Sequence, residues 1–136
     1  MNRISAPFAR MLLVLLLIYG AASLVHFIHN AEFLADYPGL PDSWTRAGVY
    51  GAWLGMTAIG VIGWALITVR REVAGLLLII VYAACGLDSL GHYVVAPISA
   101  HTIAMNVTIL LEVTAAGLVM LAAGRLLTRR ILLKKA

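Results

Sequence analysis

The sequence contains few charged residues. They occupy 12% of its 136 positions, whereas a soluble domain carries about 25%. Hydrophobic residues make up 62% of the chain, and they fall in runs of about twenty, the length at which a helix crosses a bilayer. This composition excludes an ordinary soluble domain. It indicates a single-domain integral membrane protein whose main partner is the lipid bilayer.

Cysteine is scarce too, and acidic residues are few. Cys85 is the only cysteine, so no intramolecular disulfide can form. Six acidic residues stand against ten basic ones, which gives a net charge of +4. Basic chains often bind nucleic acid, but nine of these ten basic residues flank hydrophobic runs, where they set membrane orientation. We therefore exclude nucleic acid as a partner.

The apolar runs predict four membrane-spanning helices joined by short loops. They cover residues 11–29, 47–68, 73–95 and 100–122, and a basic tail follows at 123–136. The expected fold is an all-α, four-helix transmembrane bundle. In its one sizeable loop, Tyr37 is typical of an aromatic belt at the membrane surface. In a rival interpretation, residues 1–22 are a secretory signal peptide, and three spans remain after cleavage.

The basic residues also predict the orientation of the bundle. Arg46 alone lies on one side of the spans, and the other nine lie on the opposite side: Arg3, Arg10, Arg70, Arg71, Arg125, Arg129, Arg130, Lys134 and Lys135. Because basic loops stay inside, both termini are expected in the cytoplasm. The expected location is a bacterial inner membrane, with the first and third loops in the periplasm.

Polar residues inside the fourth span share one helix face. His101, Thr108 and Glu112 recur at helical spacing, with Met105 between them, whereas Asn106 points elsewhere. A carboxylate near the middle of a bilayer costs on the order of 2.5–3.5 kcal/mol. We therefore expect Glu112 to be buried among other polar groups. Without a nearby cation it should be partly or wholly protonated at neutral pH, because desolvation disfavours the charged form.

Two other spans carry matching polar stripes. Asp88 and His92 are four residues apart, and His26 and His29 are three apart, so each pair lies on one helix face. Ser23 continues the stripe of the first span inward. All four histidines lie toward the same side of the membrane. The stripes therefore predict one polar pocket that faces the periplasm and ends at Glu112.

The leading interpretation of this pocket is a transition-metal site for copper, zinc or iron. Imidazole and carboxylate groups from different helices are the usual ligands of such sites. The candidate ligands are His26, His29, Asp88, His92 and His101, with Ser23, Thr108 and Glu112 behind them.

Two alternatives remain open. The first is a metal-free membrane enzyme in which Asp88 or Glu112 performs acid–base chemistry on a lipid or quinone. The second is a haem protein, with axial ligation by two histidines such as His26 and His92, or a structural subunit of a larger complex. Gly51 and Gly55 would let another helix approach closely, which favours contact with a second copy or a larger complex.

Overall fold

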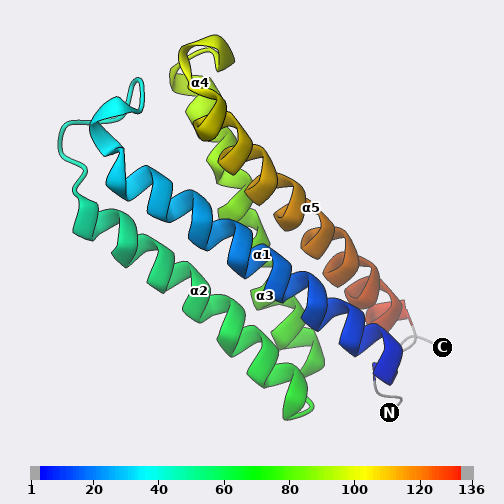
Figure 1. Ribbon diagram of the computed structural model, residues 1–136. Helices are drawn as coiled ribbons and strands as arrows, with labels where there is room; N and C mark the ends of the chain where they lie inside the picture. Colours follow the sequence, from blue (N-terminus) through cyan, green and yellow to red (C-terminus); the bar gives the residue numbers. More distant parts are fainter. Residues whose placement is uncertain (1–3, 133–136) are drawn as a thin grey trace.

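The chain forms a bundle of long helices in the computed structural model, which describes residues 4–132 (Figure 1). The main helices are α1 (Ala6–Glu32), α2 (Arg46–Thr68), α3 (Glu72–Leu87) and α5 (Ile103–Leu132). The short η2 (Asp88–Gly91) and α4 (His92–Val95) continue α3. Residues 4–132 contain no strand, and four helical segments are long and apolar enough to cross a membrane. This confirms the predicted all-helical bundle. Arg3, Lys134 and Lys135 lie outside the described residues.

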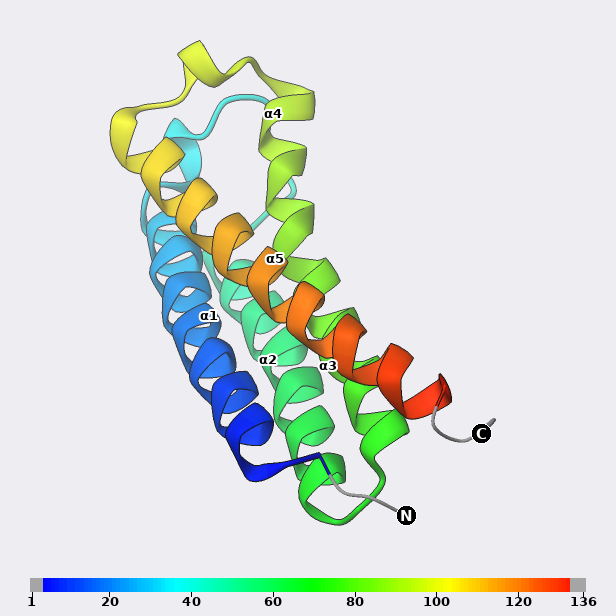
Figure 2. The same cartoon turned by 90° about the vertical axis from the view of Figure 1, so that its right-hand side faces the viewer.

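The two ends of the bundle differ in what they carry. The start of α1, the end of α5 and the turn at 69–71 lie at one end, here called the terminal end (Figures 1 and 2). The opposite loop end carries residues 33–45, with η1 (Leu34–Asp36), and residues 96–102, with η3 (Ile98–Ala100). The three polar stripes predicted from the sequence can therefore be located by their distance from the loop end.

Local sequence signals explain where the helices begin. Pro7 lies in the first turn of α1, where its missing N–H costs no hydrogen bond. Thr45 caps α2, because its hydroxyl accepts a hydrogen bond from the Gly48 N–H at 3.1 Å. Thr102 does the same for α5, accepting from the Met105 N–H at 3.2 Å. The last long helix thus begins three residues after the predicted span at 100, because η3 occupies 98–100.

Glycines bring the helices into close contact near the terminal end and midway along the bundle. A Cβ on Gly75 would lie 2.5 Å from the Gly63 carbonyl oxygen, so α2 and α3 touch backbone to backbone there. Gly86 leaves room for the ring of Tyr19, whose hydroxyl donates to the Tyr82 carbonyl at 2.9 Å. Inside a bilayer, close packing of this kind is what holds helices together.

Ion pairs join neighbouring helices at both ends of the bundle. At the terminal end, Glu72 pairs with Arg130 and accepts a hydrogen bond from the Ile4 N–H at 3.1 Å. At the loop end, Glu32 at the end of α1 pairs with Arg46 at the start of α2, with 2.6 Å between the charged atoms. The first pair joins α3 to α5, and the second joins α1 to α2.

Candidate functional site

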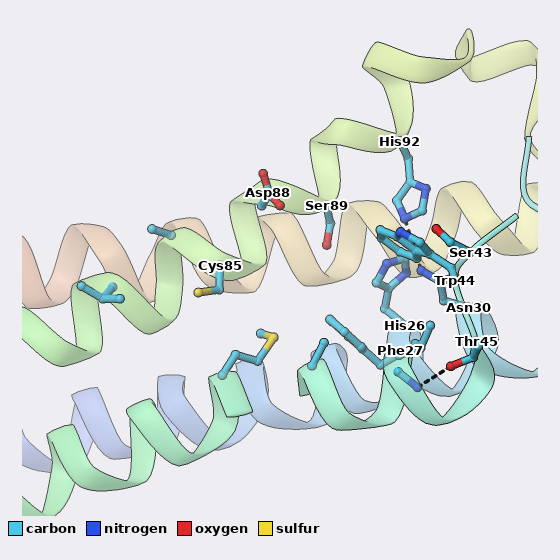
Figure 3. A pocket seen from close by; sticks show the side chains of 16 residues that line it. His26, Phe27, Asn30, Ser43, Trp44, Thr45, Cys85, Asp88, Ser89 and His92 are labelled. Carbon is cyan, nitrogen blue, oxygen red and sulfur yellow. Dashed lines mark hydrogen bonds between the residues drawn. The ribbon is translucent and has the colours of Figure 1, made fainter. Parts of the chain in front are cut away.

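The loop-end half contains a pocket of about 810 Å³ between α1, α2 and α3 (Figure 3). This volume is in the range of cavities that hold drug-sized or cofactor-sized molecules. Its apolar wall is formed by Phe27, Val49, Ala52, Met56, Val81, Ala84 and Cys85. Its polar lining includes His26, Asn30, Ser43, Thr45, Asp88, Ser89 and His92. The pocket is therefore amphipathic, with polar groups gathered toward the loop end.

The mouth of the pocket lies on the side of the bundle, between α2 and α3. Gly48 and Ala52 on α2, and Val81 and Ala84 on α3, are all exposed and all line the pocket. Figure 3 shows α3 and η2 rising away from α2 toward the loop end. The opening thus lies between two of the helical segments that are long and apolar enough to cross a membrane.

A buried cluster of three side chains stands at the polar end of the pocket. Glu112 on α5 is fully buried, and its carboxyl accepts a hydrogen bond of 2.6 Å from the Ser89 hydroxyl. The His26 Nε2 lies 3.7 Å from the same carboxyl oxygen. Ser89 and His26 line the pocket, whereas Glu112 lies behind them. Any molecule in the pocket would thus meet Glu112 through Ser89 or His26.

The histidine rings follow one another away from this cluster. The ring centroids of His26 and His92 are 5.4 Å apart, and those of His92 and His101 are 6.1 Å apart. Asn30 lies beside His92, with 3.4 Å between Nδ2 and Nε2, and the His101 Nδ1 is 3.1 Å from the Pro97 carbonyl. The His92 Nδ1 and the His101 Nε2 are buried without a hydrogen-bond partner, as is the second carboxyl oxygen of Glu112.

Tyr37 joins the histidines from the first loop. Only 4% of it is exposed, so it lies inside the protein rather than in the predicted aromatic belt at the membrane surface. Its hydroxyl is 2.9 Å from the His29 Nδ1, and its ring packs 5.1 Å from that of His92. Burial raises the pKa of Tyr37 to about 12, so the phenol keeps its proton at neutral pH.

The predicted site residues divide into two groups in the structure. Those that lie buried in or beside the cluster are Ser23, His26, His92, His101, Thr108 and Glu112. His29 is half-buried one step further out, beside Tyr37, and Asp88 is exposed. The Asp88 carboxylate points away from His26 (Figure 3), because the 3-10 turn of η2 replaces the α-helical geometry assumed for residues 88–92. Asp88 and His92 both line the pocket, but among residues 4–132 no hydrogen bond or ion pair joins them.

Side chains near the cluster take less central roles. Met105 is buried in an apolar group with Tyr37 and Ile109, and Asn106 accepts a hydrogen bond from the Tyr93 hydroxyl at 2.8 Å.

Within residues 4–132, no three His, Cys, Asp or Glu side chains lie close enough together to hold one metal ion as they stand. The rings of His26 and His92 contact each other edge to face, where a bis-histidine haem would have to separate them.

Three residues of the site and one wall of the pocket could not be predicted from the polar stripes. Ser89 and Asn30 flank predicted residues, but one small polar side chain in an apolar span carries little signal on its own. Tyr37 lies in a loop, where no helical period indicates which way a side chain points. The wall formed by α2 was missed because that span carries no polar stripe.

The chain matches no protein-family model, no curated protein and no solved structure in the comparisons made with it. The class of the molecule therefore rests on its own features. It is an all-helical bundle with four helices able to cross a membrane, and its buried acid–histidine cluster adjoins a pocket that opens sideways.

Proposed function

We propose that the protein binds a lipid-soluble, amphipathic molecule, such as a lipid or a quinone, and transfers a proton to or from its polar group. The observation that carries this proposal is the position of the Ser89–Glu112–His26 cluster at the polar end of a side-opening apolar pocket. An apolar tail would lie along Val49, Ala52 and Met56, and the polar group would reach Ser89.

The chemistry assigned to each group follows from its contacts. The Ser89 hydroxyl can donate to the ligand while it accepts a proton from Glu112, or pass a proton in the opposite direction. Glu112 is the group that holds the proton between transfers. A buried carboxyl takes up or releases a proton according to the charged and hydrogen-bonding groups next to it. His26 adjoins the same oxygen and can restore the proton. One proton moves in each event, and no electron donor or acceptor is needed.

The proposed orientation has both termini in the cytoplasm of a bacterial cell and the loop end in the periplasm. Among the described basic residues, Arg10, Arg70, Arg71, Arg125, Arg129 and Arg130 support it, because they belong to the terminal end. Arg46 belongs to the loop end, where it pairs with Glu32. Lys and Arg concentrate on the cytoplasmic side of membrane proteins.

A second candidate function is transition-metal binding. It is supported by the two buried imidazole nitrogens without partners, His92 Nδ1 and His101 Nε2, on neighbouring rings. His26 is the third ring of the row, and copper, zinc or iron would each accept imidazole ligands. Binding would require these rings to turn toward a common point, because no three His, Cys, Asp or Glu side chains among residues 4–132 lie close enough together to hold a metal ion.

Blocking the pocket should separate the two candidates. In the variant Ala52→Phe the new ring would occupy the apolar wall and displace part of the ligand, and a loss of about 1.4 kcal/mol in binding corresponds to ten-fold in affinity. We expect native mass spectrometry and lipid extraction to show a bound lipid-soluble molecule on the wild type, and about ten-fold less on this variant.

The matched control is Ala58→Phe, which adds the same ring to an exposed position of α2 outside the pocket and should retain the bound molecule. Elemental analysis of the same tag-free preparations tests the metal candidate. Stoichiometric copper, zinc or iron with no bound lipid-soluble molecule, unchanged by Ala52→Phe, would contradict the leading proposal and support the second.

A further inference from the structure

A row of polar groups connects the loop end of the bundle to Glu112 and meets the pocket only at His26. It begins at His29, half-buried near the end of α1, whose Nδ1 is 2.9 Å from the Tyr37 hydroxyl. The Thr108 hydroxyl is near enough to the same phenol to oppose the rise in its pKa, lies 3.3 Å from the His26 Nδ1 and donates to the Met105 carbonyl at 3.0 Å. The other nitrogen of His26 faces Glu112. The row thus crosses from α1 to the first loop, to α5 and back to α1.

Beyond His29, this row is sealed from bulk water. The exposed fractions are 4% for Tyr37, 8% for Thr108, 1% for His26 and 0% for Glu112. A proton that reaches Glu112 from the loop end must therefore pass through side chains rather than through a column of solvent. The unpartnered Glu112 oxygen shows that the carboxyl has capacity for a further hydrogen bond.

We infer that His29, Tyr37, Thr108 and His26 form a proton relay between solvent at the loop end and the Glu112 carboxyl. Each group accepts a proton on one side as it gives one up on the other, which moves one proton along the row and leaves the imidazole tautomers exchanged and the hydroxyls reversed. Rotation of the rings and hydroxyls then resets the row. No electron is transferred. The relay goes beyond the ligand-binding function, since it operates with the pocket empty.

Each link has the chemistry that such a relay needs. An imidazole can take a proton on one nitrogen and release it from the other, which is how His26 would connect Thr108 to Glu112. The His26 Nε2 and the Glu112 carboxyl oxygen are 3.7 Å apart, so the ring must rotate toward the carboxyl for the proton to pass. Hydroxyl groups donate and accept, so Tyr37 and Thr108 can pass a proton in either direction.

Proton exchange at the His26 ring tests this inference directly. Protein labelled with 15N-histidine would be stripped of pocket lipid, reconstituted in phospholipid bilayers and transferred into D2O. Solid-state NMR would then follow loss of the His26 imidazole N–H signal, assigned with the variant His26→Gln. Either neutral tautomer of His26 carries an N–H, so the signal does not depend on the charge of Glu112.

Removing the Tyr37 hydroxyl with Tyr37→Phe should slow this exchange about ten-fold or more, the loss expected for a positioned proton-transfer group. The matched control is Tyr93→Phe. This phenol also lies at the loop end, where it donates to Asn106 and packs 5.4 Å from His101, but it is outside the row. Exchange in this control should stay within about two-fold of the wild type.

A second variant, Thr108→Val, replaces a hydroxyl of the row with a methyl group and should slow the exchange as well. It provides the test of the relay if Tyr37→Phe does not fold. The relay is wrong if folded Tyr37→Phe or Thr108→Val exchanges at the wild-type rate, or if Tyr93→Phe slows it equally. None of these outcomes depends on a bound ligand, so failure of the relay is distinguishable from failure of the proposed binding function.

Discussion

Glu112→Gln is expected to leave the bundle folded and the pocket filled, while slowing proton transfer to the bound molecule by about 10²–10⁴-fold. The glutamine amide oxygen can still accept the Ser89 hydrogen bond, so the packing around residue 112 is preserved. What the variant loses is an ionisable proton at the only fully buried carboxyl among the described residues. The effect should therefore fall on chemistry and not on stability.

Chromatography and mass spectrometry of the extracted pocket molecule would measure this effect. The wild type should carry a mixture of the molecule before and after proton transfer, whereas the Glu112→Gln protein should accumulate only one of the two forms. Glu32→Gln is the control, because Glu32 lies at the same end of the bundle but pairs with Arg46 outside the cluster. Identical mixtures in all three proteins would contradict a proton-transfer role for Glu112.

Gly75→Ala is expected to destabilise the bundle by about 1–3 kcal/mol, the usual cost of forcing an extra carbon into a packed contact. The new Cβ would lie 2.5 Å from the Gly63 carbonyl oxygen and 3.0 Å from the Ile67 backbone nitrogen. Neither backbone atom can turn aside as a flexible side chain would. Relief requires α2 and α3 to move apart, and close packing between helices is the main source of their association in a bilayer.

Thermal unfolding in detergent micelles would measure this change, with Gly117→Ala as the control. Gly117 has open space where its Cβ would lie, so alanine there should be neutral or stabilising by up to about 1 kcal/mol through its better helix propensity. Equal unfolding temperatures for the two variants would show that the close contact between Gly63 and Gly75 does not contribute to stability.

The helical architecture was predictable because long apolar runs leave few options in a membrane. The stripe of His101, Thr108 and Glu112 was equally readable, since a 3.6-residue period applies along the whole of α5. Asp88 shows the limit of this reasoning, because it lines the pocket as His92 does and yet is exposed. The spacing argument assumed an unbroken α-helix over 73–95, but η2 interrupts it at 88–91 and leaves Asp88 exposed.

The side-opening pocket could not be predicted, for a different physical reason. It results from the divergence of α2 and α3 toward the loop end, and the angle between two helices is set by side-chain packing along their full length. Gly63 and Gly75 hold these helices together near the terminal end. In a sequence, small residues indicate where two helices can approach closely. They do not indicate how the helices separate beyond that contact. Tyr37 was missed for lack of any period in its loop.

The modification rate of Cys85 tests most directly whether a lipid-soluble molecule occupies the pocket. Cys85 is half-buried, lines the pocket and is the only thiol in the chain, so a small thiol reagent reports on this one cavity. The protein would be stripped of lipid in detergent, then reloaded with the total lipid extract of its host membrane. Ala52→Phe and Ala58→Phe would be treated in the same way.

We expect reloading to protect Cys85 about ten-fold, as it should when the lipid stands near ten times its dissociation constant. Stripped Ala52→Phe should react slowly even without lipid, because the new ring takes the place of the ligand, and stripped Ala58→Phe should react as the wild type does. A Cys85 rate that is unaffected by lipid in the wild type, and the same in stripped Ala52→Phe, would contradict the account.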